Sequence, residues 1–184
     1  MDTQPVLETK RLILRPFKLS DSEQVQKLAG NKQIASTTLM IPHPYPDGAA
    51  EEWIKTHNEK YVSGRGVYFA ITLKENGELV GAVNLLGIVE SQRGELAYWV
   101  GVPYWNKGYC TEAGDAVLRY GFLDRGLNRI HARYFSRNPA SGRVLEKLGM
   151  VHEGTQRQHV LKWCVYEDME LMGILRSEWE TKEK

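Results

Sequence analysis

Cysteine is scarce in this chain of 184 residues, which contains only Cys110 and Cys164. The two cysteines show no disulfide-framework spacing and no secretory signal ahead of them, so we expect free thiols in a reducing compartment. Long hydrophobic runs are also missing, because polar or charged residues interrupt every apolar stretch before the ~20 residues that a membrane span needs. These absences predict a soluble, cytoplasmic protein that acts away from membranes.

An excess of charge of one sign is absent as well, since 24 Lys and Arg residues stand against 23 Asp and Glu residues. That balance argues against direct nucleic-acid binding, which usually requires a dominant basic surface. The sequence has no His-Glu-x-x-His or Cys-x-x-Cys pattern, and its five histidines are scattered singly, so no metal site is predicted. With 42% apolar residues, the length fits a single domain over residues 1–184.

The first third of the chain predicts one strand and two helices. Alternating leucines predict a strand over residues 11–15. A capping box that begins at Ser20 predicts a helix, which Gly30 ends. Three prolines over residues 42–46 then exclude regular structure until Asp47 caps the second helix.

The remainder predicts a mixed sheet. An Asn-Gly hairpin signal at residues 75–77 joins two strands, and "GELAYWVGV" follows as a third. A helix, a strand at Arg129, a short helix closed by Gly149 and two further strands complete the order. Strands with helices inserted between them predict an α/β (α+β) fold with a mixed sheet covered on its faces. The strand that ends near Val102 is expected to cross over in parallel to the strand at Arg129.

The stretch "YWVGVPYWNKGYCTEAG" at residues 98–114 passes from a strand through a turn into a helix. Backbone N–H groups at such a junction lack partners inside the helix, and the helix dipole adds positive charge, so the junction suits an anion. Gly108 would let a phosphate approach the backbone closely, and Lys107 would add a full charge. The alternative is a plain turn with a glycine where the backbone needs one.

Four segments in order, "ETKRLILRPF", "GELAYWV", "YWNKGYCTEA" and "NPASGRVLEKLGM", resemble the GCN5-related N-acetyltransferases, the GNAT family. Within that family the chain is similar to the RimJ/RimL type, which acetylates N-terminal amines of ribosomal proteins. The resemblance runs from about Glu8 to Trp179. It implies a mixed, mostly antiparallel sheet that is splayed between its fourth and fifth strands, with helices on both faces and acetyl-CoA inserted in the splay.

The resemblance places the family's pyrophosphate loop, Gln/Arg-x-x-Gly-x-Gly/Ala, on residues 105–110. Trp105 stands where the family has Gln or Arg, and Cys110 replaces a small residue. Because the loop binds through backbone amides, both changes are compatible with binding. The cofactor-binding residues implied in this way are Trp99, Val100, Val102, Asn106, Lys107, Gly108, Tyr109, Cys110, Thr111, Asn138 and Ser141.

The resemblance also implies roles around the leaving group. Ser141 matches the small residue that is proposed in this subgroup to stabilise or protonate the leaving thiolate. Many members use a tyrosine at the position that Leu145 occupies here. Asn138 matches an asparagine that contacts the cofactor. The Asn-Pro pair also fits a helix N-cap followed by the first helical residue, and the two roles are compatible.

Glu95 is the candidate general base. It begins the strand expected to flank the thioester, where a carboxylate takes a proton from the amine directly or through water. The alternative is a solvated glutamate at a strand end, with Glu78, Glu167 and Asp168 as substitutes for the base. His43 is expected to bind the acceptor because it lies in the proline-stiffened loop.

Tyr45 of the same loop is the second residue predicted to bind the acceptor, since prolines reduce the entropy that the loop loses on binding. The alternative is that Tyr45 only covers the sheet. An α-amino group with a pKa of ~7.7–8 costs about 1 kcal/mol to deprotonate at neutral pH, whereas a lysine near ~10.4 costs about 4.6 kcal/mol. That difference favours an N-terminal α-amine or a small amine of low pKa as the acceptor.

The predicted function is therefore transfer of an acetyl group from acetyl-CoA to a primary amine by direct attack, without a metal. A ribosomal-protein N-terminus is the acceptor that the resemblance implies. An acetyltransferase of small-molecule amines and a non-catalytic acetyl-CoA-binding module are the alternatives. A homo-oligomer is left open.

Overall fold

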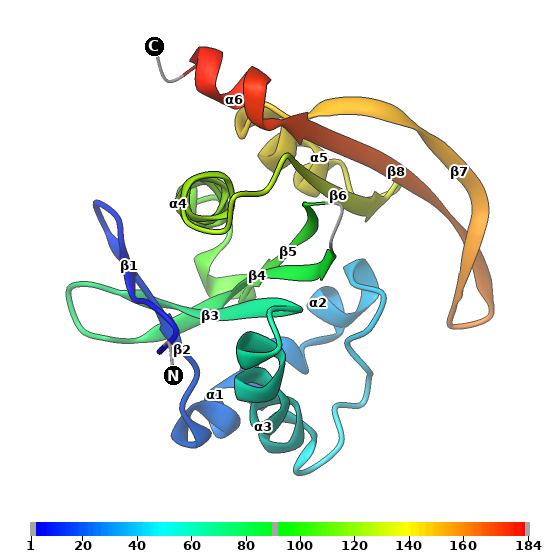
Figure 1. The fold of residues 1–184 in the computed structure, drawn as a ribbon. Helices are drawn as coiled ribbons and strands as arrows, with labels where there is room; N and C mark the ends of the chain where they lie inside the picture. The colour runs from blue at the N-terminus through cyan, green and yellow to red at the C-terminus, as the bar shows by residue number, and fades with distance from the viewer. Residues whose placement is uncertain (1–2, 90–91, 183–184) are drawn as a thin grey trace.

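The computed structural model describes residues 3–89 and 92–182. Its strands, labelled in Figure 1, are β1 (Leu7–Glu8), β2 (Leu12–Pro16), β3 (Gly66–Leu73), β4 (Leu79–Val89), β5 (Arg93–Val100), β6 (Arg129–Phe135), β7 (Val151–Lys162) and β8 (Val165–Leu175). Its α-helices are α1 (Ser22–Ala29), α2 (Lys32–Thr37), α3 (Ala49–Val62), α4 (Tyr109–Leu123), α5 (Pro139–Lys147) and α6 (Arg176–Lys182). The 3₁₀ helices η1 (Leu19–Asp21) and η2 (Val102–Tyr104) precede α1 and α4.

The eight strands form one sheet in the order β1-β2-β3-β4-β5-β6-β8-β7. Neighbours are antiparallel except β5 and β6, which are parallel and joined through α4, as the predicted crossover requires. These two strands pair only from Arg93 to Glu95 on β5, although β5 continues to Val100 and β6 to Phe135. They therefore diverge beyond Glu95. This divergence is the splay that the resemblance implied between the fourth and fifth strands, which are β5 and β6 here because the short β1 was not predicted.

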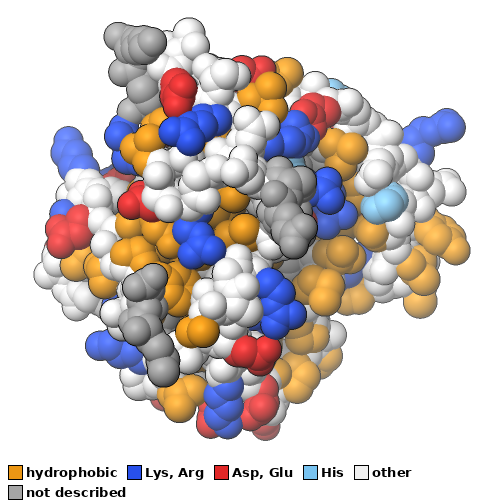
Figure 2. Space-filling view, in the orientation of Figure 1, with side chains coloured by type: hydrophobic (Ala, Val, Ile, Leu, Met, Phe, Trp, Pro, Cys, Tyr) orange, Lys and Arg blue, Asp and Glu red, His pale blue; other side chains and the backbone are white. Residues whose placement is uncertain are grey.

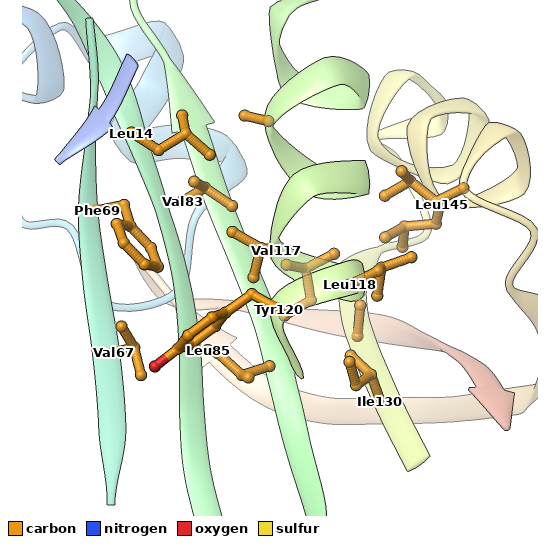
Figure 3. Packing of buried hydrophobic residues seen from close by; sticks show 14 of the residues in the cluster. Leu14, Val67, Phe69, Val83, Leu85, Val117, Leu118, Tyr120, Ile130 and Leu145 are labelled. Atoms are coloured by element: carbon orange, nitrogen blue, oxygen red, sulfur yellow. The ribbon is translucent and has the colours of Figure 1, made fainter. Parts of the chain in front are cut away.

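Helices cover both faces of the sheet (Figure 1). We call the side of α4 and α5 the α4 face and the side of α1, α2 and α3 the α3 face. The main core fills the space between the sheet and α4, where strand residues such as Val83 meet Val117 and Leu118 (Figure 3). A smaller cluster, which includes Val25 and Ile54, packs α1 and α3 on the opposite face.

Alternation along the first long strand is confirmed, since Leu12 and Leu14 are fully buried. The predicted hairpin is confirmed as well, because β3 and β4 pair in antiparallel register around a turn in which Gly77 has φ 74°. The loop at residues 38–48 contains no helix or strand, as its prolines predicted. These features depend on neighbours in the sequence, so local patterns were sufficient to predict them.

The two predicted helix caps are wrong. Ser20 lies within η1, and Asp21 is the N-cap residue of α1. The Asp21 carboxylate accepts hydrogen bonds from Arg15 at 2.7 and 2.8 Å, which draws it toward β2. Asp47 instead accepts from Gln26 Nε2 at 2.8 Å, so the N-cap position of α3 falls to Gly48. Long-range partners thus redirect both carboxylates.

Helix α2, the short strand β1 and the C-terminal helix α6 were not predicted. The signal for α2 was present in the sequence, because the Asn31 side chain accepts the N–H of Gln33 as an N-cap. Helix α2 has only six residues, which gives little room for a periodic apolar pattern. Its consequence is structural: it lies on the α3 face and leads into the proline loop.

Candidate active site

The turn between η2 and α4, residues 105–111, forms an open backbone cradle that we call the phosphate loop. Asn106 and Gly108 both have left-handed backbone angles, with φ 61° and 79°, and Gly108 is the N-cap of α4. The first hydrogen bond of the helix runs from Glu112 N to Gly108 O. The N–H groups just before Glu112 therefore have no acceptor inside the helix. With the helix dipole behind them, they suit a phosphate.

Two basic side chains flank the phosphate loop. Lys107 is exposed on the loop itself, and the Arg11 guanidinium lies 4.8 Å from the ring centroid of Tyr109. A Cβ built on Gly108 would meet Arg11 Nη2 at 3.5 Å. The acid in the first turn of α4, Glu112, is held by Arg11 through hydrogen bonds of 2.7 Å and so is balanced by a cation. Arg11 was not predicted at this site, because it lies in the turn just before β2, about 100 residues away in the sequence.

The edge of β5 that faces the splay is formed by the backbone N–H and C=O groups of every second residue. Gly101 donates its N–H to a carbonyl oxygen of β4 at 2.9 Å. Backbone groups alternate along a strand, so those of Trp99 also turn to β4, whereas those of Tyr98 and Val100 turn to the splay. The carbonyl oxygen of Val100 accepts the indole N–H of Trp105 at 2.7 Å. Trp105 therefore holds the phosphate loop against the end of this edge.

The other predicted cofactor residues lie along the same path. Val102 begins η2 directly after β5, and Tyr109, Cys110 and Thr111 form the first turn of α4. Cys110 packs against the main core, and burial raises the pKa of its thiol to about 12. Cys110 is therefore a neutral thiol at physiological pH. Contacts of these residues with acetyl-CoA stay predictions.

Tyr98 joins β5 to α5 across the splay on the α4 face. Its Oη lies 2.8 Å from Ser141 Oγ and donates to Ser141 O at 3.1 Å. Burial raises the pKa of Tyr98 well above its ordinary range, and the hydrogen bond with Ser141 offsets only part of that effect. The phenol therefore stays protonated at neutral pH. Tyr98 was not predicted for this role, because the family's tyrosine position is occupied here by Leu145, which is fully buried in the main core.

Asn138 is the N-cap of α5, as one of its two interpretations predicted. Its side-chain oxygen accepts the N–H of Ser141 at 3.4 Å, and Pro139 is the first helical residue. The cap places Ser141 in the first turn of α5, facing Tyr98. A contact between Asn138 and acetyl-CoA stays a prediction.

Glu95 lies where β5 and β6 begin to diverge, on the α3 face, because its neighbour Leu96 is buried in the main core. Both carboxylate oxygens of Glu95 accept hydrogen bonds from Arg133, at 3.1 and 3.0 Å. This ion pair was not predicted, since Arg133 comes from β6, 38 positions away in the sequence. A proton that moves to Glu95 therefore has to compete with a guanidinium.

His131 lies beside this pair, with Nε2 3.9 Å from Glu95 Oε2. Burial lowers the pKa of His131, and the Glu95 carboxylate opposes that effect only in part, so the imidazole is neutral at neutral pH. Among the described residues, His131 Nδ1 and Asn84 Oδ1 are buried without a hydrogen-bond partner. Asn84 is directly opposite Ala97 of β5 on the same face. Buried polar atoms are normally paired, so these two atoms depart from the usual pattern.

The proline loop and the turn of the β7–β8 hairpin meet on this face. Lys162 Nζ donates to two carbonyl oxygens of the loop, at 3.1 and 3.0 Å. His43 Nδ1 lies 3.1 Å from the Gly30 carbonyl oxygen, and its ring lies 6.1 Å from that of Trp163. Tyr45 packs against the smaller cluster and thus covers the sheet. Acceptor binding by His43 and Tyr45 stays a prediction, and both border the α3 face.

The rim of this region is apolar rather than charged. Figure 2 shows hydrophobic side chains gathered over the β7–β8 hairpin on the right of the view. Exposed large apolar residues of the hairpin and the loop are Met40, Leu161, Trp163, Val165 and Tyr166. This surface is therefore suited to apolar groups.

The three substitutes considered for the base have partners, as Glu95 does, and they differ from Glu95 in position: none of them lies on β5. Tyr104 donates its hydroxyl to Glu78 at the far end of β5. Arg137 Nε donates to Glu167 at 2.7 Å, and Asp168 accepts a backbone N–H at 2.7 Å. Glu95 is therefore the candidate that lies at the start of the splay.

Within residues 3–89 and 92–182, no group of three or more His, Cys, Asp or Glu side chains could hold a metal ion. No helix in the described part of the chain has the length and apolarity needed to cross a membrane. Cys110 and Cys164 are both free thiols, as predicted.

A loop suited to phosphate at the start of α4 and a sheet that splays beside it are the features that the resemblance to the GNAT family implied. The Acetyltransferase (GNAT) domain matches residues 11–151, and the chain belongs to this family. The Bacillus subtilis (strain 168) protein Uncharacterized N-acetyltransferase YoaA is 31% identical over 94% of this chain and 97% of its own length. The Ribosomal protein uS5-alanine N-acetyltransferase of Escherichia coli (strain K12) is 28% identical over 74% of this chain and 71% of its own length.

Solved structures agree with the fold. The ribosomal-protein-S5-alanine acetyltransferase from Vibrio fischeri has a TM-score of 0.84 at 23% identity and covers 96% of this chain and 99% of its own. A chimera of the Vibrio cholerae spermidine N-acetyltransferase SpeG has a TM-score of 0.79 at 22% identity, with coverage of 92% and 98%. RimL, solved in complex with coenzyme A, has a TM-score of 0.85 at 15% identity, with coverage of 93% and 98%. The GNAT fold and the N-acetyltransferase class predicted from the sequence are confirmed.

Proposed function

We propose that this N-acetyltransferase is of the RimJ/RimL-like type and acetylates the N-terminal α-amine of a protein, with a ribosomal protein as the acceptor class, in the cytoplasm. Acetyl-CoA, the acetyl donor of the family, supplies an activated thioester. The phosphate loop, with Lys107 and Gly108, would hold the diphosphate of acetyl-CoA. The β5 edge at Tyr98 and Val100 would hold its pantetheine arm. The unpartnered helix N–H groups and the open splay support this assignment.

The observation that carries the choice of acceptor is the pairing of carboxylates beside the splay. Glu95 is paired with Arg133, and Glu167 is paired with Arg137. A polyamine such as spermidine, named in the SpeG neighbour, carries several positive charges and would need unpaired carboxylates to neutralise them. A protein N-terminus brings one amine, and its following side chains can contact the apolar rim.

Deprotonation of the amine favours the same acceptor. A terminal α-amine costs about 1 kcal/mol to deprotonate at neutral pH, whereas an amine with a pKa near ~10.4 costs about 4.6 kcal/mol. Both carboxylate oxygens of Glu95 are engaged by Arg133, and burial lowers the pKa of His131, so His131 is a weaker base than a free imidazole. A weak base is sufficient to deprotonate the α-amine and insufficient to deprotonate an amine with a pKa near ~10.4.

The alternation of β5 assigns the two halves of the reaction to opposite faces. Glu95 and His131, on the α3 face, are proposed to accept the amine proton, directly or through water. Ser141 and Tyr98, on the α4 face, are proposed to face the leaving sulfur. Because residues 95 and 98 differ by an odd number, a straight strand necessarily points them to opposite sides. The acceptor therefore approaches from the α3 face.

A panel of acceptors, read by thiol release, tests the proposed function. Peptides that begin with alanine or serine are expected to show a kcat/KM about a hundredfold or more above that of spermidine, since the deprotonation costs differ by roughly 3.6 kcal/mol. The same peptide with a blocked N-terminus and an internal lysine is the matched control and should release no thiol. Faster turnover of spermidine than of every free peptide would contradict the choice of acceptor.

Glu95→Gln is expected to lower kcat about tenfold or more at pH 6 and progressively less as the pH rises toward the pKa of the acceptor amine. The reason is that a neutral amine no longer needs a base. Glu180→Gln is the matched control, because it neutralises the acid of another arginine pair, with Arg176, that lies on α6. A Glu95→Gln enzyme with wild-type rates at every pH would remove the base from the mechanism.

His43→Ala and Tyr45→Ala are expected to raise the KM for the peptide about threefold to tenfold, the loss of roughly 1 kcal/mol of contact, and to leave the KM for acetyl-CoA unchanged. Steady-state kinetics with each substrate varied in turn measures both constants. Because Tyr45 packs against the smaller cluster, the melting temperature of its variant is measured in parallel. Equal rises in the two KM values would show general disturbance of the site rather than acceptor binding.

A further inference from the structure

Two hydrogen bonds bridge the splay on the α4 face, and they join the same two residues. Tyr98 Oη lies 2.8 Å from Ser141 Oγ and 3.1 Å from Ser141 O. The phenol has one hydrogen, which it can donate either to Ser141 O, an acceptor only, or to Ser141 Oγ, which both donates and accepts. In either arrangement the two contacts place the phenol oxygen beside the serine hydroxyl.

We propose that Tyr98 is the positioning residue that holds the Ser141 hydroxyl toward the sulfur that leaves acetyl-CoA. The inference rests on the acetyl transfer stated under the proposed function, and it adds Tyr98 to the residues that perform it. Ser141 alone, in the first turn of α5, could rotate its hydroxyl freely. When the phenol turns its one hydrogen from Ser141 O to Ser141 Oγ, the serine hydrogen becomes available for another acceptor, the sulfur.

The surroundings of Tyr98 suit this role. The ionisable groups near Tyr98 whose ionised forms would act on its phenol are Cys110 of α4 and Tyr134 of β6. Both are neutral at physiological pH, because burial raises the pKa of each. The pair thus lies in an environment without a nearby full charge that would compete for the Ser141 hydrogen. A hydrogen bond to a developing anion is stronger in such an environment than in water.

The proposed step balances as follows. The acceptor nitrogen bonds to the acetyl carbon, and the carbon–sulfur bond breaks with its electron pair on sulfur. Ser141 Oγ donates its hydrogen bond to that sulfur while Tyr98 Oη donates to Ser141 Oγ. The nitrogen loses one proton on the α3 face, and the sulfur takes one proton from solvent, so neither residue is consumed.

Ionisation of the thiol of bound coenzyme A tests the proposal without any acceptor. The ultraviolet absorbance of the thiolate is measured against pH for free coenzyme A and for its complexes. In the wild-type complex the thiol of coenzyme A is expected to ionise at a lower pH than in free coenzyme A. The acid dissociation constant of the bound thiol should be about tenfold larger, which shifts the midpoint by about one pH unit. Tyr98→Phe and Ser141→Ala are each expected to return the midpoint toward that of free coenzyme A.

Turnover gives the second measurement. Tyr98→Phe is expected to lower kcat about tenfold or more while leaving the KM for acetyl-CoA within about twofold, because the interaction strengthens as charge develops. The Tyr98→Phe, Ser141→Ala double variant should be no slower than the slower single variant, as residues that act as one unit are not additive. Tyr134→Phe is the matched control. It removes a hydroxyl of β6 that lies beside Gly142 of α5, the residue that follows Ser141. This variant should change neither the ionisation midpoint nor kcat.

The outcomes separate the proposal from other failures. A wild-type midpoint equal to that of free coenzyme A, or a folded Tyr98→Phe enzyme with wild-type midpoint and kcat, would overturn the role of Tyr98. If Tyr98→Phe does not fold, Ser141→Ala keeps the ring and its midpoint decides. Wild-type protein that ionises bound coenzyme A but acetylates no peptide would refute the proposed acceptor and leave this inference standing.

Discussion

Replacing Gly108 with valine is expected to weaken the binding of acetyl-CoA by well over tenfold. Gly108 is the N-cap of α4 with φ 79°, a conformation that a β-branched residue adopts only under strain. The new Cβ would meet Arg11 Nη2 at an ordinary distance of 3.5 Å. The loss therefore comes from a reshaped phosphate loop and from bulk where a phosphate approaches the helix N–H groups. Isothermal titration calorimetry measures the affinity.

Gly126→Val provides a matched control for backbone strain. Gly126 follows α4 with φ 64°, and a Cβ there meets nothing within 4 Å. Both variants should lose about 1–2 kcal/mol of stability, because both force a side chain into the left-handed region. Only Gly108→Val should lose affinity. A folded Gly108→Val protein that binds acetyl-CoA as tightly as Gly126→Val would show that the phosphate loop does not hold the diphosphate.

Acid is expected to destabilise the protein through one buried histidine. His57 on α3 is 6% exposed, and its ring stacks on Tyr68 at 4.1 Å with an interplanar angle of 7°. Among the described residues, neither ring nitrogen has a hydrogen-bond partner. Burial, with a smaller effect from Lys60, lowers the pKa of His57 from 6.5 to about 3. The folded protein therefore holds His57 in its neutral form.

The sign of the pH effect follows from proton binding. Between about pH 6.5 and pH 3 the unfolded chain binds a proton at His57 that the folded chain does not. The contribution of His57 to the free energy of unfolding is therefore fully present above pH 6.5. Below that pH the free energy of unfolding falls by about 1.4 kcal/mol per pH unit, to a total loss of roughly 5 kcal/mol near pH 3. His131, whose pKa burial also lowers, contributes with the same sign.

His57→Phe is expected to remove most of this slope, because phenylalanine fits an aromatic site and cannot be protonated. The difference in free energy of unfolding between the variant and the wild type should shift by about 2 kcal/mol in favour of the variant from pH 7 to pH 5. The difference between their melting temperatures should shift in the same direction by roughly 4–8 °C. Urea titrations between pH 7 and pH 5 measure the difference before carboxylates titrate. His159→Gln, at an exposed position of β7, should keep the wild-type slope. If His57→Phe also keeps it, another group causes the acid sensitivity.

Much of the fold could be predicted because its determinants are local. The Asn-Gly turn, the alternating leucines and the strand–turn–helix stretch at residues 98–114 each describe their own backbone within about ten residues. The phosphate loop belongs to this class, since the left-handed conformations of Asn106 and Gly108 arise within one turn. Prediction was wrong where a distant charge intervened. Arg15 draws Asp21 toward β2, so the cap expected at Ser20 does not form.

The sequence by itself determined the strand that ends in a phosphate loop, the order of the long strands and helices, and the GNAT family. Only the tertiary structure decided which side chains meet at the splay. Tyr98 pairs with Ser141 over 43 positions of sequence, and Glu95 pairs with Arg133 over 38. Such pairs depend on the register of β5 against β6 and on where the two strands part, and that is set by packing across the whole sheet. Local patterns specify the backbone of each element, whereas the partner of a buried side chain is chosen by the elements that enclose it.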